Sequence, residues 1–271
     1  MCTRRGSPRG AATAVVPATL RTVPLIADPA FYAVAIPAAL LVGVGKSGVA
    51  GGFGILAVPL IALVMPVPQA AAIVLPLLTV GDLFGLAALI RHRDRALLRV
   101  LLPAGLAGTV VGFLLFGVLS PKTVSAVLGV MTLLFIAQRA WSSAGAAARV
   151  VPRWFAALAG LVSGVTSFVA HAGGPPISIA LLPMRLAPAV FAGTTSVFFT
   201  VINASKWLPY AWLGLIDGTN MLSAIALAPF AALGVWLGVK VLRRLPAVWF
   251  YRVVSAGLLI TGLKLTWDGL R

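Results

Sequence analysis

The sequence predicts an all-α, polytopic integral membrane protein. Hydrophobic residues make up 61% of its 271 residues and charged residues only 10%, whereas a soluble domain carries about 25% charged residues. Long uncharged runs recur along the chain, and the short alternating segments of a β-barrel do not. We expect about eight hydrophobic segments in two inverted repeats, each of which begins with a helical hairpin broken by glycine or proline.

Basic residues greatly outnumber acidic ones, with 21 Lys plus Arg against 5 Asp plus Glu and a net charge of +16. In a soluble protein this excess would indicate nucleic-acid binding. Here the basic residues cluster in short connections between apolar runs, which is the pattern of cytoplasmic loops. We therefore expect the lipid bilayer as a partner and no nucleic acid. Cys2 is the only cysteine, so an intrachain disulfide is excluded.

The first half begins with a polar N-terminal tail over residues 1–30, which is rich in Arg and Pro. Residues 31–140 form the first predicted transmembrane repeat. Its first apolar region is interrupted by glycines between Gly43 and Pro59, and irregular backbone at membrane depth must be buried in protein or line a polar cavity. Three further segments are long enough to span a bilayer, at residues 69–90, 97–119 and 123–140.

The second half has the same plan. Residues 141–153 form a predicted loop between the repeats, and residues 154–271 form the second repeat. Its first apolar region is broken around residues 171–176. The predicted spans that follow are residues 189–210, 221–242 and 249–267. Two broken segments at corresponding positions of two halves are typical of the binding site of a transporter.

Basic loops set the expected orientation. If residues 91–99, 141–153 and 240–244 are all cytoplasmic, each broken segment must return to the side where it started. The halves are then inverted, and both termini lie outside. The alternative, a single crossing by each broken segment, would place Lys240, Arg243 and Arg244 outside. We prefer the inverted arrangement.

Two motifs resemble those of the TauE/SafE family of sulfite-exporter-like membrane proteins. The first is K-S-G-x-x-G-G-x-G-x-x-x-x-P, from Lys46. The second is S-G-x-x-S-x-x-x-x-x-G-G-P-P, from Ser163, followed by F-x-G-T at 191–194 and N-x-x-K at 203–206. Ala50 departs from the commoner G-x-G-G-G form. The resemblance implies a transporter of the bacterial inner membrane, with sulfite, sulfonates or other sulfur-containing organic anions as substrates.

Charged residues are costly within a membrane span, so those that remain are candidates for function. Lys46 and Ser47 lie in the first break beside Gly51 and Gly52, where a restarting helix can bind an anion. The alternative for Lys46 is a side chain that extends to the membrane interface. Lys206 and Asn203 share a helix face and can offer a cation and an amide donor to an oxyanion. The alternative for Lys206 is interfacial anchoring beside Trp207 and Tyr210.

The second break supplies His171, Gly173 and Gly174 to the expected anion site. His171 can also carry a proton, although a lone histidine is often a structural group. Asp82 lies within a span and can take a coupling proton or pair with a basic residue. Thr166, Ser167 and Ser178 are weaker candidates, because helical hydroxyls often bond back to their own helix.

Catalytic and nucleotide-binding motifs are missing from the sequence, so we expect neither an enzyme nor an ATP-driven pump. We also expect no metal and no cofactor. The predicted function is secondary transport of small anions, driven by an ion or substrate gradient, with a proton or ion for coupling. The alternatives are a passive anion channel and an intramembrane lipid-processing enzyme. A homodimer is left open.

Overall fold

The computed structural model describes residues 25–46, 53–118, 120–141, 150–240 and 247–271. These residues form helices and no strand, which confirms the predicted all-α class. The predicted segments form helices with ends close to those expected, and short helical turns adjoin the two breaks. The elements are α1 (Pro29–Lys46), η1 (Phe53–Leu56), α2 (Ala57–Ile61), α3 (Val67–Leu89), η2 (Ile90–His92), α4 (Arg95–Val118), α5 (Pro121–Trp141), α6 (Arg153–Ala170), α7 (Gly174–Leu181), η3 (Leu182–Met184), α8 (Pro188–Trp212), α9 (Gly218–Lys240) and α10 (Ala247–Leu270).

Six of the described helices are long and apolar enough to cross a bilayer. They include α1, α3, α4, α6, α8 and α9, and the chain is therefore a multi-pass membrane protein. The helices α5 and α10 have 21 and 24 residues. The expected total of eight membrane segments stays a prediction.

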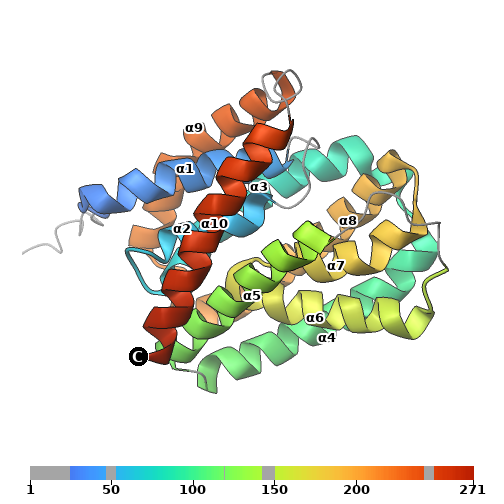
Figure 1. The fold of residues 1–271 in the computed structure, drawn as a ribbon, viewed down its shortest axis with the longest axis horizontal. Coiled ribbons are helices and arrows are strands. Elements are labelled where there is room, and N and C mark those ends of the chain that lie inside the picture. Colours follow the sequence, from blue (N-terminus) through green and yellow to red (C-terminus); the bar gives the residue numbers. More distant parts are fainter. Residues whose placement is uncertain (1–24, 47–52, 119, 142–149, 241–246) are drawn as a thin grey trace, which may run out of the picture.

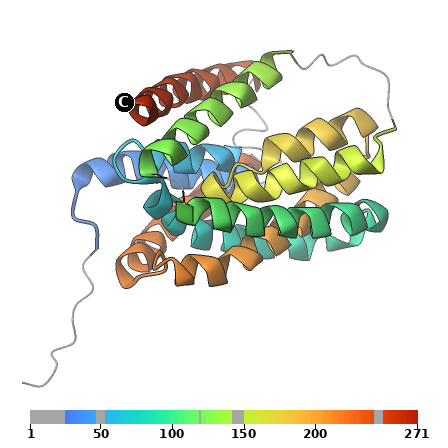
Figure 2. The ribbon, with the colours of Figure 1, turned by 90° about the horizontal axis from the view of Figure 1, so that it is seen from below.

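The helices pack in pairs drawn from different parts of the chain. The main partners are α1 with α9, α4 with α6, α3 with α8, and α5 with α10. Figure 1 and Figure 2 show α5 and α10 crossing side by side along one side of the molecule. The pairs α4–α6 and α3–α8 lie beside each other, and the short helix α7 packs on α6.

Glycines allow two of these pairs to approach closely. On α4, a Cβ added at Gly108 would lie only 2.0 Å from the carbonyl oxygen of Leu161 on α6. On α1, a Cβ added at Gly43 would lie 2.0 Å from the carbonyl oxygen of Ala231 on α9. The G-x-x-x-G spacing of Gly108 and Gly112 thus marks a close helix contact, as this motif does in other membrane proteins.

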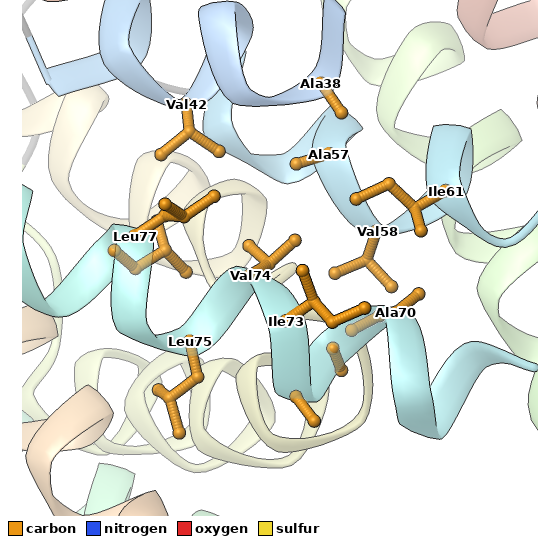
Figure 3. Packing of buried hydrophobic residues seen from close by; sticks show 14 of the residues in the cluster. Ala38, Val42, Ala57, Val58, Ile61, Ala70, Ile73, Val74, Leu75 and Leu77 are labelled. Carbon is orange, nitrogen blue, oxygen red and sulfur yellow. The ribbon is translucent and has the colours of Figure 1, made fainter. Parts of the chain in front are cut away.

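A core of small and branched side chains holds α1, α2 and α3 together (Figure 3). Side chains from all three helices meet there, and most of them are fully buried. They include Ala38 and Val42 of α1, Ala57, Val58 and Ile61 of α2, and Ala70, Ile73 and Val74 of α3. Burial of these side chains fixes the C-terminal end of α1, and hence Lys46, against α3.

The second break is a chain reversal between α6 and α7. His171 follows the last residue of α6 and has a left-handed backbone conformation, with a φ of 53°. The hydroxyls of Ser163 and Thr166 donate to the carbonyl oxygens of Gly173 and Ala172, at 2.7 Å and 3.0 Å. These contacts show that the chain folds back along α6 before α7 begins.

Candidate functional site

A cavity of about 350 Å³ lies between α1, η1, α3, α6, α7 and α8. Most of its wall is apolar, with side chains such as Leu78, Ile177 and Phe199. Its charged and hydrogen-bonding side chains include Lys46, Asp82, Ser167, His171, Ser178, Thr195, Ser196 and Asn203. A largely apolar cavity with a few converging polar groups is the usual form of a small-molecule site.

One side of the cavity is formed by α3 and α8, which run antiparallel. Asp82 bonds to Asn203, Gly85 faces Ser196, and the backbone of Leu89 lies against Gly193. The lining residues on α3 extend from Leu78 to Leu89, a distance of about 16 Å along a helix. The cavity thus runs from the middle of α3 toward the end that precedes the basic segment at residues 91–95.

One polar network connects α1, α3 and α8. The ammonium of Lys46 forms an ion pair with Oδ1 of Asp82. The side-chain amide of Asn203 donates to Oδ2 of the same carboxylate. Asp82 is 3% exposed, and it lies four residues past the middle of α3. Lys46 is therefore paired with a buried carboxylate, while its own side chain keeps 22% of its surface exposed.

A second network surrounds Lys206, whose side chain has no exposed surface. Its Nζ contacts three acceptors: the carbonyl oxygen of Ser167 at 3.0 Å, Oγ of Ser167 at 3.0 Å, and Nδ1 of His171 at 2.7 Å. Three acceptors match the three N–H donors of an ammonium group. Nε2 of His171 lies 2.9 Å from the carbonyl oxygen of Ala71, so a neutral imidazole places its proton on Nε2.

The charges of the two networks do not cancel. Among the described residues, the ion pairs are Lys46–Asp82 and the exposed Lys264–Asp268 pair. No described carboxylate pairs with Lys206. Two lysines and one aspartate therefore lie around the inner part of the cavity, which leaves a formal excess of one positive charge there.

The start of α7 forms another part of the cavity wall. A Cβ added at Gly174 would contact nothing within 4 Å, so this glycine leaves open space. A Cβ at Gly173 would lie 2.6 Å from Oγ of Ser163 and 2.9 Å from the ring of Phe199. The first N–H groups of a helix have no partner within it, but Pro175 and Pro176 have no N–H group. The backbone donors here are consequently few, and they come from the two glycines.

The structure brings most of the expected site residues together. Lys46, Asp82, His171, Gly174 and Asn203 line the cavity. Lys206 differs from the expectation, because it lies behind Ser167 and His171 and does not line the cavity. Ser47, Gly51 and Gly52 lie outside the described residues.

Ser167, a weaker candidate from the sequence, also lines the cavity, as do four residues that the sequence did not single out: Gly81, Gly85, Thr195 and Ser196. A Cβ at Gly81 would lie 2.8 Å from Cγ of Lys46, so this glycine makes room for the lysine stem. The i, i+4 spacing of Gly81 and Gly85 among bulky neighbours was the available signal.

A substitution at Gly85 tests whether the expected anion transport runs through this cavity. A Cβ at this position would lie 3.0 Å from Oγ of Ser196, so Gly85→Leu should fill the cavity between α3 and α8. We expect Gly85→Leu to remove most anion uptake into proteoliposomes. The matched control is Ala88→Leu, which introduces the same side chain at an exposed position of the same helix and should keep wild-type uptake. Equal uptake by both variants would contradict a route along this contact.

Comparison with known proteins gives one family match. The model of the family described as "Sulfite exporter TauE/SafE" matches residues 35–265, which is most of the chain. No curated protein and no solved structure matches significantly. The matched region contains α3, α4, α6, α7, α8 and α9 and all the cavity-lining residues named above. The chain therefore belongs to the TauE/SafE sulfite exporter family of membrane transporters.

Proposed function

We propose that this protein is a secondary transporter of small anions in the bacterial inner membrane. Sulfite, sulfonates and related sulfur-containing organic anions are the proposed substrates, and an ion or substrate gradient is the proposed driving force. The observation that carries this proposal is the excess positive charge beside the cavity, where Asp82 pairs with Lys46 and Lys206 has no described carboxylate partner. An anion in the cavity would balance that charge.

The proposed anion site combines both networks with the start of α7. Lys46 supplies positive charge, Asn203 and His171 supply hydrogen bonds, and Gly173 and Gly174 supply backbone donors. Ser47, Gly51 and Gly52 of the first break complete the proposed site. Lys206 contributes its charge from behind the cavity wall. The family membership supports a transporter and gives no role to these individual residues.

Asp82 is the proposed coupling group. Its carboxylate accepts hydrogen bonds from Lys46 and Asn203. These are the same donors that an anion would use. Protonation of Asp82 weakens its hold on Lys46 and frees the ammonium for the substrate. Proton binding and anion binding then favour each other, as linkage requires. His171 is a second proposed proton site, because its Nδ1 accepts from Nζ of Lys206 at 2.7 Å and can take over the proton of that bond.

Two inverted repeats, residues 31–140 and 154–271, are the proposed basis of alternating access. The helix pairs support this division. The first helix of each half packs against the fourth helix of the other half: α1 against α9, and α6 against α4. Asp82 of α3 bonds to Asn203 of α8, and these two helices have the same place in the order of helices in the two halves.

Transport by the purified protein in proteoliposomes tests the proposal. The panel comprises sulfite, methanesulfonate, sulfate, thiosulfate and acetate, each with and without an inward-directed pH gradient. We expect saturable uptake of a sulfur oxyanion that the pH gradient enhances. The double variant Lys46→Gln/Lys206→Gln should show no uptake and should still insert into the membrane.

Three results would count against this assignment. Uptake that persists in the double variant would exclude the two lysines as the source of anion affinity. Uptake that equilibrates but never concentrates the anion under any imposed gradient would indicate a channel. Failure to transport any member of the panel would exclude the substrate class.

A further inference from the structure

We propose that Ser167 is an anion-binding residue and that Lys206 acts on the anion through its hydroxyl group. Ser167 would donate its hydroxyl hydrogen to an oxygen of a small oxyanion, such as sulfite or a sulfonate. Lys206 would be a positioning residue that never touches the substrate. This inference rests on the proposed function and names a residue and a contact within that site.

The contacts of Lys206 leave it no donor for a substrate. All three of its N–H groups are directed at acceptors of the protein, two of them on Ser167 and one on His171. Its side chain has no exposed surface, and it is not among the residues that line the cavity. Direct contact with an anion would require Lys206 to give up one of these bonds.

Ser167 stands between Lys206 and the cavity. Its Oγ accepts a hydrogen bond from Nζ of Lys206 at 3.0 Å, and its side chain lines the cavity. A serine hydroxyl has one donor in addition to its acceptor lone pairs. Because the oxygen side of the hydroxyl is engaged by the ammonium, the hydrogen must point elsewhere. No described acceptor takes this hydrogen, so it is available to a ligand.

Three other buried hydroxyls in the described helices behave differently. Thr109, Thr166 and Ser223 all donate to a backbone carbonyl oxygen, at 3.0 Å, 3.0 Å and 2.7 Å. This is the usual behaviour of helical serine and threonine residues. Ser167 instead keeps its hydrogen, because its hydroxyl is oriented by a cation.

The polarity of this arrangement selects the ligand class. A hydroxyl that accepts from an ammonium becomes a stronger donor, since hydrogen bonds in a chain polarise one another. It offers a hydrogen to the cavity, and its oxygen already lies 3.0 Å from an ammonium, so it favours an anion and disfavours a cation. The two hydrogen bonds, from Lys206 to Ser167 and from Ser167 to the anion, also carry the effect of the buried Lys206 charge to the cavity without exposing that charge.

Kinetics of ³⁵S-sulfite uptake by Ser167 variants test the proposal. A hydrogen bond to a charged group is a strong contribution, so Ser167→Ala should raise the KM about ten-fold or more with little change in the maximal rate. Ser167→Cys keeps a side chain of similar size with a weaker donor. Its KM should lie between that of the wild type and that of Ser167→Ala. The control Thr109→Val removes a buried hydroxyl from the neighbouring helix α4, outside the cavity lining, and should keep the wild-type KM.

A double-mutant cycle separates action through Ser167 from direct contact. If Lys206 acts through Ser167, Lys206→Met and Ser167→Ala should each raise the KM, and the combined variant should be little worse than either. Additive effects would indicate that Lys206 contacts the anion itself and would overturn the relay. An unchanged KM in both Ser167 variants, with saturable wild-type uptake, would overturn the role of Ser167 alone. Absence of saturable uptake by the wild type would overturn the proposed function and this inference with it.

Discussion

Removal of Lys46 alone should destabilise the protein more than removal of Lys46 and Asp82 together. Lys46→Met leaves the carboxylate of Asp82 buried in the protein without its ion-pair partner, and loss of one partner from a buried pair costs about 3–5 kcal/mol. Lys46→Met/Asp82→Asn removes both charges and should recover most of the stability. Neither variant should transport anions, because both lack the cation at the cavity.

Thermal unfolding in detergent, followed by the fluorescence of the seven tryptophans, measures this difference. The matched control is Lys264→Met, which breaks the other described ion pair. Both partners of that pair are about half exposed, so its loss should cost less than about 1 kcal/mol. Equal unfolding temperatures for Lys46→Met and Lys264→Met would show that burial does not determine how much the Lys46–Asp82 pair contributes to stability.

Gly108→Ala should be the most damaging single-methyl change on α4. Its Cβ would lie 2.0 Å from the carbonyl oxygen of Leu161, well inside any real contact, so α4 and α6 would have to separate. Overpacking of this kind costs about 1–3 kcal/mol, and sometimes more. Because α6 carries Ser167 and His171, the separation should also weaken anion uptake.

The same substitution elsewhere provides the comparison. Gly43→Ala would bring a Cβ within 2.0 Å of Ala231 on α9 and should lower the unfolding temperature in the same way. Gly54→Ala would meet only a side-chain carbon of Leu78 at 3.7 Å, an ordinary contact. We expect its unfolding temperature to stay near that of the wild type. A similar loss in Gly54→Ala would mean that the helix contact is not the cause.

Much of the fold was predictable because a membrane restricts the sequence strongly. Each spanning helix needs a long apolar run, so the helices could be located from composition alone. The G-x-x-x-G spacing on α4 indicated a close partner without naming it. The break at His171 was visible because glycine and proline interrupt an otherwise apolar segment.

The site was harder to predict, since it depends on which groups meet across helices. The sequence left two roles open for Asp82, and the structure shows the ion pair with Lys46. It placed Lys206 in the anion site or at the interface, whereas the end of α6 surrounds it with three acceptors. The orientation of the Ser167 hydroxyl depends on its contact with Lys206. No local pattern in the sequence distinguishes it from Ser163.

Pro76 divides α3 between its two attachments to the second half of the chain. His171 holds α3 at Ala71, and Asn203 holds it at Asp82, about 16 Å further along the helix. Pro76 lies between these points and cannot donate to the carbonyl oxygen of Ala72. The helix therefore lacks one backbone hydrogen bond between its two attachments. A bend at this point is where α3 would yield first if Ala71 moved with α6 and Asp82 with α8.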